Sequence, residues 1–292
     1  MTTPERRSVP LSDGAISFLD WQAPKGAPVL MFAHANGFNA TTYIRLLEPL
    51  ADEFRVIALD MRGHGETKLP TDSRLATGWR VFRDDLLRFL DALAIRPDVL
   101  AGHSLGASAS LMAAAARKDL AKALVLFEPV MATDRAARAA ALARLLGRPE
   151  KANPLYAPAL KRRAQFKSRE DAVKSFTGRG PFRTWPAQMV ADYVAGGLLP
   201  DGDGFRLACD PKWEAASYAT YPFRIAALGS CIAAPVTILA GTEHSATAPE
   251  VLNDFIRRHG DTRALRIEGA SHFLPMERPD LFRDEIRRAL SA

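Results

Sequence analysis

The chain alternates short apolar runs with segments of helical periodicity, and this alternation limits its possible folds more than any other feature. A continuous apolar run such as 28–33 is typical of a strand buried on both faces. The apolar positions between 80 and 94 recur at helical spacing. Strands alternating with helices predict an α/β fold with a mostly parallel, doubly wound sheet. We expect strands at 28–33, 54–59, 98–101, 123–127, 235–240 and 264–268, a hairpin at 8–21 turning at Asp13-Gly14, and helices at 41–52, 80–94, 105–117, 249–259 and 278–291.

The alternation stops between residues 131 and 230. This segment is rich in Ala and Arg and has no comparable apolar run, so we predict a mostly helical insertion, or cap. The predicted domains are therefore 1–130 and 231–292 for the two parts of the core and 131–230 for the cap. Helical stretches are expected near 134–146, 158–177 and 186–195, and the Gly- and Pro-containing stretches 178–181 and 200–204 are candidate hinges.

The basic residues are distributed unevenly. The net charge of the chain is +6, and residues 131–230 contain 16 Lys and Arg against nine Asp and Glu, whereas the remainder contains 23 against 24. This excess fits either a solvated helical face or a cap that attracts an anionic acyl substrate or an acidic surface. We find no nucleic-acid-binding motif, so no nucleic-acid partner is expected.

Composition also argues against several classes of protein. The two cysteines, Cys209 and Cys231, do not form a disulfide framework, which favours a reducing compartment. Residues 1–10 are charged and do not resemble a secretory signal, and no apolar run approaches the roughly 20 residues that cross a bilayer. We expect a cytoplasmic protein without a membrane partner. No metal-ligand spacing and no dinucleotide fingerprint is found, so neither metal nor cofactor is expected, and the oligomeric state is left open.

The strongest local motif is G-x-S-x-G at residues 102–106, between a predicted strand and a predicted helix. This context is the one in which such a motif exposes a nucleophilic serine, here Ser104, on a sharp turn. The backbone N–H of Leu105, at the helix N-terminus, would then point at the reacting oxygen. The alternative is a glycine-framed helix start in which Ser104 is only a structural cap.

A serine hydroxyl needs a base within hydrogen-bonding reach, and His272 is the best candidate. It follows the strand predicted at 264–268, on a loop at the sheet edge where active sites of parallel sheets form. The alternative is a loop histidine without a role. The other five histidines are weaker candidates, and the side chain of His103, next to Ser104, is expected to point elsewhere.

Four segments together resemble the α/β-hydrolase family, in order and at suitable intervals. They are 34–38 (HANGF), 60–65 (DMRGHG), 102–106 (GHSLG) and 269–272 (GASH). The resemblance covers roughly 190 residues of the two core sections. It implies that the backbone N–H of Asn36 is the second oxyanion-hole donor beside that of Leu105; a plain turn at 34–38 is the alternative.

The acid of the expected triad departs from the family pattern. The usual Asp position after the seventh strand is occupied by His244, which leaves Glu243 or Glu128 as replacements. Glu128 directly follows the apolar run at 123–127, an unusual place for a charge without a partner. Some family members, including a group of haloalkane dehalogenases, resemble this arrangement. We favour Glu128 and keep Glu243, or no acid at all, as alternatives.

Several side chains are candidates for the substrate pocket. Aromatic residues of the cap either line an apolar acyl pocket or form the core of the cap itself. The predicted lining residues are His34, Phe38, His103, Phe182, Trp185 and Phe273.

These residues predict a serine hydrolase that cleaves an ester, thioester or lactone of a small molecule through an acyl-enzyme. Haloalkane dehalogenases and epoxide hydrolases of the family that this chain resembles use an Asp nucleophile. A serine such as Ser104 forms an acyl-enzyme, which favours carbonyl substrates over alkyl halides or epoxides. Carbon–carbon bond hydrolysis or a cofactor-free peroxidase-type activity on the same residues are alternatives. A non-catalytic ligand-binding protein of the same fold is another.

Overall fold

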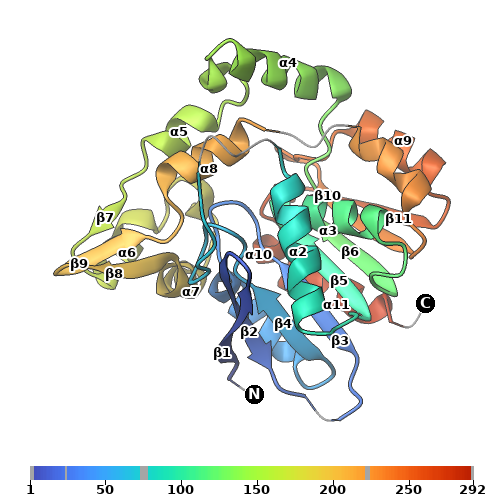
Figure 1. Ribbon diagram of the computed structural model, residues 1–292, viewed down its shortest axis with the longest axis horizontal. Helices are drawn as coiled ribbons and strands as arrows, with labels where there is room; N and C mark the ends of the chain where they lie inside the picture. Colours follow the sequence, from blue (N-terminus) through green and yellow to red (C-terminus); the bar gives the residue numbers. More distant parts are fainter. Residues whose placement is uncertain (1–2, 24, 73–77, 221–223, 291–292) are drawn as a thin grey trace.

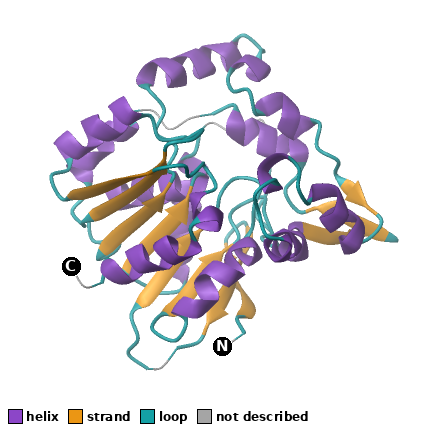
Figure 2. Ribbon diagram, turned by 180° about the vertical axis from the view of Figure 1, so that it is seen from behind, coloured by secondary structure: helices purple, strands orange, loops and turns teal. Residues whose placement is uncertain are grey.

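The computed structural model describes residues 3–23, 25–72, 78–220 and 224–290. They form one eight-stranded sheet in the order β1-β2-β4-β3-β5-β6-β10-β11, flanked by helices on both sides (Figures 1 and 2). The strands from β4 to β11 in this order pair in parallel, and β1 and β2 pair antiparallel at one edge. The predicted α/β fold is confirmed. The strands are β1 (Glu5–Leu11), β2 (Gly14–Trp21), β3 (Val29–Ala33), β4 (Arg55–Leu59), β5 (Val99–His103), β6 (Ala123–Phe127), β10 (Val236–Gly241) and β11 (Thr262–Ile267).

The sheet separates two apolar cores, which explains why its strands read as continuous apolar runs. Along β3, Leu30 and Phe32 belong to one core, whereas Met31 and Ala33 belong to the other. Successive side chains of a strand point to opposite faces, so a strand covered on both faces must be apolar at every position. One core packs against α2 (Arg80–Ala92), α3 (Leu105–Ala116) and α9 (Pro249–Arg258), and the other against α1 (Ile44–Leu47), α10 (Leu274–Glu277) and α11 (Pro279–Arg288).

Two of the expected core helices are shorter than predicted. The stretch 41–52 is a run of short turns, η1 (Ala40–Tyr43), α1 and η2 (Glu48–Leu50). The expected helix at 278–291 is α11, and the separate α10 precedes it. The break falls at Arg278, the residue before Pro279, with φ −133° and ψ 62°. A residue before proline avoids helical geometry, which accounts for the interruption.

The segment 131–230 leaves the sheet after β6 and returns at β10, its neighbour. It packs on the loops after β3 and β4: the Asn39 amide donates to the Tyr193 carbonyl (3.0 Å), and the Trp213 indole N–H donates to the Arg62 carbonyl (3.1 Å). Its helical elements are α4 (Asp134–Leu145), η3 (Pro149–Lys151), α5 (Tyr156–Leu160), α6 (Arg169–Phe176), η4 (Gly180–Phe182), α7 (Ala187–Gly197), α8 (Pro211–Tyr218) and η5 (Ile225–Cys231).

The insertion also contains a small antiparallel sheet that the sequence analysis did not predict. It has the order β7-β9-β8, formed by β7 (Gln165–Phe166), β8 (Leu198–Asp201) and β9 (Gly204–Leu207). The prediction of one helix over 158–177 is wrong, because β7 separates two shorter helices there, α5 and α6. The stretch 200–204, taken as a candidate hinge, is the tight turn of the β8–β9 hairpin. These strands of two to four residues are too short to show the periodicity on which strand prediction depends.

None of the helices in the described ranges is long and apolar enough to cross a bilayer.

Candidate active site

Ser104 lies at the sharp turn between β5 and α3, with φ 55° and ψ −116°. This backbone conformation is unfavourable for a residue with a side chain, and it persists only where the surroundings enforce it. The two glycines of the motif permit close packing there. A Cβ at Gly106 would lie 2.2 Å from the carbonyl oxygen of Ala33, and one at Gly102 would lie 2.6 Å from the Gly106 carbonyl carbon. The motif therefore packs the turn against β3.

Ser104, His272 and Glu128 form one hydrogen-bonded chain. Nε2 of His272 lies 2.9 Å from Oγ of Ser104, and Nδ1 of His272 lies 3.1 Å from Oε2 of Glu128. Because a carboxylate only accepts, the imidazole carries its proton on Nδ1, which leaves Nε2 free to accept the serine proton. The three residues come from the ends of β5 and β6 and from the loop between β11 and α10. The structure thus brings together side chains that lie up to 168 residues apart.

The carboxylate of Glu128 is completely buried and accepts hydrogen bonds at both oxygens. Oε1 accepts from the Gly241 backbone N–H (2.5 Å), and Oε2 accepts from the Ala246 backbone N–H (2.9 Å). The Ser245 hydroxyl lies 2.9 and 3.0 Å from the two oxygens. These donors come from the end of β10 and the loop that follows it. Sequence reasoning missed Ser245, because only the pairing of β6 with β10 brings it to Glu128.

The alternative acid, Glu243, lies elsewhere. Its side chain is exposed, and in the described part of the chain no hydrogen bond joins it to His272. The structure therefore places Glu128, and not Glu243, beside the imidazole.

The two predicted oxyanion donors lie on the first loop and at the start of α3. Neither the backbone N–H of Asn36 nor that of Leu105 has an acceptor among the residues described. The Asn36 side chain is held by the Glu214 carbonyl of α8 (3.3 Å), and its Oδ1 has no partner there. Unpaired backbone donors at a buried site are available to a developing oxyanion.

Two buried histidines fix the shape of the loop that carries Asn36. Nε2 of His34 accepts the Met61 N–H (2.9 Å), and its Nδ1 donates to the Ala35 carbonyl (2.7 Å). Nε2 of His64 accepts the Gly37 N–H (2.9 Å). Burial lowers the pKa of His34 to about 4 and that of His64 to about 3. Both rings are therefore neutral, and His34, predicted to line the pocket, instead has its ring nitrogens occupied inside the protein.

A second buried network joins the oxyanion loop to the loop of His272. The Tyr43 oxygen accepts the Ala35 N–H (3.2 Å) and lies 2.7 Å from Nδ1 of His103, and Nε2 of His103 lies 2.8 Å from the His272 carbonyl. Since that carbonyl only accepts, His103 carries its proton on Nε2 and Tyr43 donates to Nδ1. Burial lowers the pKa of His103 well below its usual value. His103 thus supports the loops instead of presenting a polar edge to the pocket, and no sequence pattern singles out Tyr43.

The predicted aromatic pocket residues do come together. The Phe38 ring lies 5.3 Å from that of Trp185 and 6.3 Å from that of Phe273, which neighbours His272. Phe182 lies behind them, 5.0 Å from Trp185. The buried Trp185 indole N–H has no acceptor within the described part of the protein. These side chains form an apolar wall beside the triad with one free donor in it.

One cation of the insertion, Arg162, is buried and already paired. Arg162 is bonded to Glu214 and, at 2.5 Å, to the Tyr193 hydroxyl. A Cβ at Gly37 would lie 2.6 Å from Oε1 of Glu214, which places this pair directly against the oxyanion loop. Burial raises the pKa of Glu214 despite the neighbouring Arg162. Sequence analysis missed this pair, and the only sequence signal was the clustering of basic residues at 161–163.

In the ranges that the structure describes, no three His, Cys, Asp or Glu side chains are grouped so that they could hold a metal ion.

A parallel sheet with a serine at a strand-to-helix turn, a histidine on a later loop and a buried carboxylate defines a class of hydrolytic enzymes. The model of the alpha/beta hydrolase family matches residues 30–285, and the chain belongs to this family.

Three comparisons, one by sequence and two by structure, illustrate the similarity. The 2-(acetamidomethylene)succinate hydrolase of Mesorhizobium japonicum is 26% identical over 260 residues, which cover 87% of this chain and 84% of that protein. The crystal structure of E-2-(acetamidomethylene)succinate hydrolase superposes with a TM-score of 0.79 at 21% identity, covering 99% of this chain and 100% of that one. The thioesterase domain from the curacin biosynthetic pathway gives a TM-score of 0.77 at 19% identity, covering 98% and 100%.

Proposed function

We propose that this protein is a serine hydrolase that cleaves an ester-like bond of a small molecule, an ester, thioester or lactone, through an acyl-enzyme on Ser104. One observation carries the proposal: Oγ of Ser104, the imidazole of His272 and the carboxylate of Glu128 are joined by hydrogen bonds of 2.9 and 3.1 Å. This is the geometry in which an imidazole activates an alcohol, and the acid orients the ring and stabilises its cation.

The reaction follows from these positions. Nε2 of His272 takes the Ser104 proton as Oγ attacks the carbonyl carbon, and the N–H groups of Asn36 and Leu105 hold the resulting oxyanion. His272 then returns the proton to the leaving group, and the carbon–heteroatom bond breaks. A water molecule then attacks the acyl-enzyme and gives a proton to the same Nε2. His272 passes this proton to Oγ of Ser104 as the acyl–oxygen bond breaks, which releases the acid and restores the free serine.

The substrate would lie between the triad and the segment 131–230, which we propose acts as a cap. The wall of Phe38, Trp185 and Phe273 suits an apolar acyl or leaving group, and the free Trp185 N–H suits an acceptor on it. Because Arg162 is paired with Glu214, the interpretation of the cap as an attractor of anionic acyl groups receives no support from this cation.

The first experiment is labelling with a fluorophosphonate probe. We expect the label on Ser104, located by mass spectrometry, and none in Ser104→Ala. Ser110→Ala is a matched control. Ser110 is also buried in α3, and its hydroxyl has no hydrogen-bond partner among the described residues. If the wild-type protein binds small ligands but is not labelled, it is a binding protein and the proposal fails.

The second experiment compares substrate classes. Nitrophenyl esters, acyl thioesters and lactones are assayed beside a diketone, and beside the enamide dicarboxylate after which the Mesorhizobium japonicum relative is named. We expect a burst of nitrophenol equal to the enzyme concentration, because an acyl-enzyme accumulates. Turnover of the diketone alone would favour the carbon–carbon hydrolase alternative.

A further inference from the structure

Helix α4 points its large apolar side chains toward solvent. It buries only Ala137 and Ala140, whereas Leu142, Leu145 and the adjoining Leu146 are 55%, 83% and 65% exposed. Residues three and four apart share one face of a helix, so these leucines form a single stripe opposite the two alanines. Surface helices normally turn their larger apolar residues toward the core. The amphipathic order of α4 is therefore inverted, and Figure 1 shows it at the top of the molecule, away from the sheet.

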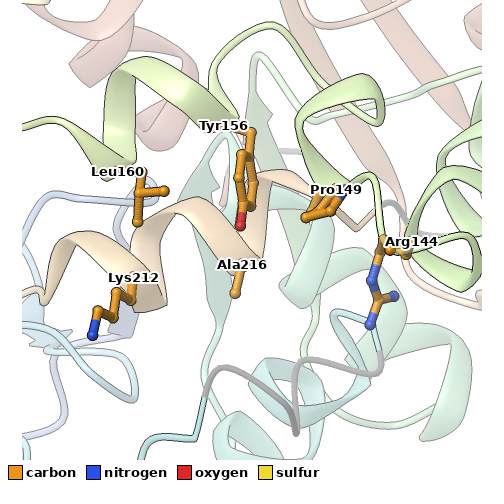
Figure 3. Close-up of a pocket in the computed structure, with 8 residues that line it drawn as sticks. Arg144, Pro149, Tyr156, Leu160, Lys212 and Ala216 are labelled. Carbon is orange, nitrogen blue, oxygen red and sulfur yellow. The ribbon is translucent and has the colours of Figure 1, made fainter.

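The exposed leucines are clustered. Among the described residues, six large hydrophobic side chains are exposed, and all but Leu290 lie between 142 and 160. Leu160, on α5, lines a hollow of about 430 Å³ together with Arg144 of α4 and with Lys212 (Figure 3). The hollow lies between the two helices on the inner side of α4, and of the exposed leucines only Leu160 lines it. Isolated exposed leucines need no explanation, but three on one side of a single helix indicate an interaction surface. We call residues 134–163 the leucine face.

The leucine face is also basic. It contains eight Lys and Arg against two Asp and Glu, although Arg162 is paired with Glu214 and Arg163 with Asp171, which lie outside the face. Arg135 and Arg138 of α4 are exposed, as are Arg148, Lys151 and Lys161. These five cations are the part of the basic excess that lies at the surface in the same segment as the leucines.

We propose that the leucine face docks on the surface of an anionic lipid bilayer. Leu142, Leu145 and Leu146 insert at the boundary between headgroups and acyl chains, and the surrounding Arg and Lys contact anionic headgroups. Aliphatic residues on one side and basic residues around them are the composition by which helices lie in a membrane interface. Docking would hold the cap, and the triad beneath it, against the membrane.

A second copy of the chain fits this surface poorly. A two-fold contact would place the exposed cations of this surface directly against the same cations of the second copy. Leucine is also under-represented among the residues that anchor protein interfaces, and the large apolar side chains exposed in the described ranges are all leucines. The expectation that no membrane is involved rested on the lack of a spanning segment, and that criterion does not test a helix that lies on the surface.

Vesicle binding of the full chain tests the proposal. We expect flotation with phosphatidylcholine vesicles that contain roughly one phosphatidylglycerol in four lipids, and little with pure phosphatidylcholine. The combined Leu142→Gln, Leu145→Gln and Leu146→Gln variant should lower the partition coefficient by about tenfold or more. The double variant Arg135→Gln, Arg138→Gln should weaken the dependence on phosphatidylglycerol. Leu290→Gln is the matched control, since Leu290 is exposed outside the face.

The proposal is overturned if neutral and anionic vesicles bind equally, or if the leucine variant binds like the wild type. Light scattering after size exclusion gives a further test. A dimer that the leucine variant abolishes would show that a second copy covers the face. A monomer without vesicle binding would point to an acidic protein and would equally refute the lipid proposal. Melting temperature and nitrophenyl ester hydrolysis should be unchanged in all variants, which separates this test from that of the triad.

Discussion

Replacing Glu128 by Gln should separate the proposed acid from a merely structural carboxylate. The side chain is completely buried, and each oxygen accepts a backbone N–H, from Gly241 or Ala246. An amide has only one oxygen, so in either orientation its NH₂ group faces one of these donors. The charge that would balance the His272 imidazolium is also lost.

Both losses can be estimated. One buried donor left without an acceptor costs about 1–3 kcal/mol of folding stability. Replacement of the acid by its amide lowers kcat by roughly 10⁴-fold in Ser-His-Asp enzymes. This corresponds to about 5 kcal/mol of transition-state stabilisation. We expect Glu128→Gln to show a lower melting temperature and a loss of kcat of this order.

The assay is nitrophenyl ester hydrolysis at a temperature well below the melting transition of the variant. Glu243→Gln provides the control because Glu243 is one residue from the usual acid position and is exposed. It should retain kcat within about twofold, since surface substitutions rarely perturb a buried site. If Glu128→Gln kept its kcat, or if Glu243→Gln lost as much, the assignment of Glu128 as the acid would be refuted.

Three further predictions concern the support of the site. Gly106→Ala should destabilise the protein by about 1–3 kcal/mol, because the added Cβ meets the β3 backbone, whereas Gly260→Ala, with open space around it, should be nearly neutral in thermal denaturation. Equal melting temperatures would contradict this. Tyr43→Phe should leave two buried polar partners unpaired, costing about 1–3 kcal/mol and lowering kcat/KM; unchanged values of both would refute the proposed support. The unfolded chain protonates His34 and His64 near the ordinary pKa of about 6.5, but the folded chain does so only near pH 4 and 3. Stability should therefore fall as the pH is lowered from 7, by about 2 kcal/mol per ring at pH 5, and ring protonation above pH 6 in NMR titration would contradict it.

The core of the fold could be read from the sequence because its physical cause is local. A strand such as 123–127 is buried on both faces, so each of its residues is apolar and the run stands out. The small sheet of the segment 131–230 has no such signal, since β7 has only two residues, of which Phe166 is buried and Gln165 is exposed. The Asp-Gly-Asp-Gly stretch at 201–204 could have suggested a hairpin, but without flanking apolar runs it was taken for a hinge.

The site was predictable to the extent that its chemistry is tied to short motifs. Ser104 and His272 stand in such motifs, and the charge of Glu128 interrupts an apolar run. The network through Tyr43 and His103 could not be predicted, because it depends on how three loops lie relative to one another. A histidine whose ring nitrogens are both used internally has the same sequence pattern as one that faces a substrate.

The position of Glu128 follows from the order of the strands. β6 and β10 are parallel neighbours, with Phe127 paired to Leu239, so the loops that follow them begin at the same edge of the sheet. A carboxylate after either strand can therefore approach the same imidazole, although the two positions are more than a hundred residues apart. In this protein the loop after β10 supplies the donors of Ser245 and Ala246 to Glu128 instead of an acid. An acid after β6 in place of one after β10 requires that the loop after β10 supply these donors, because a buried carboxylate without them would be strongly destabilising. Ser245→Ala should then lower both stability and kcat, though less than Glu128→Gln, since the backbone donors remain.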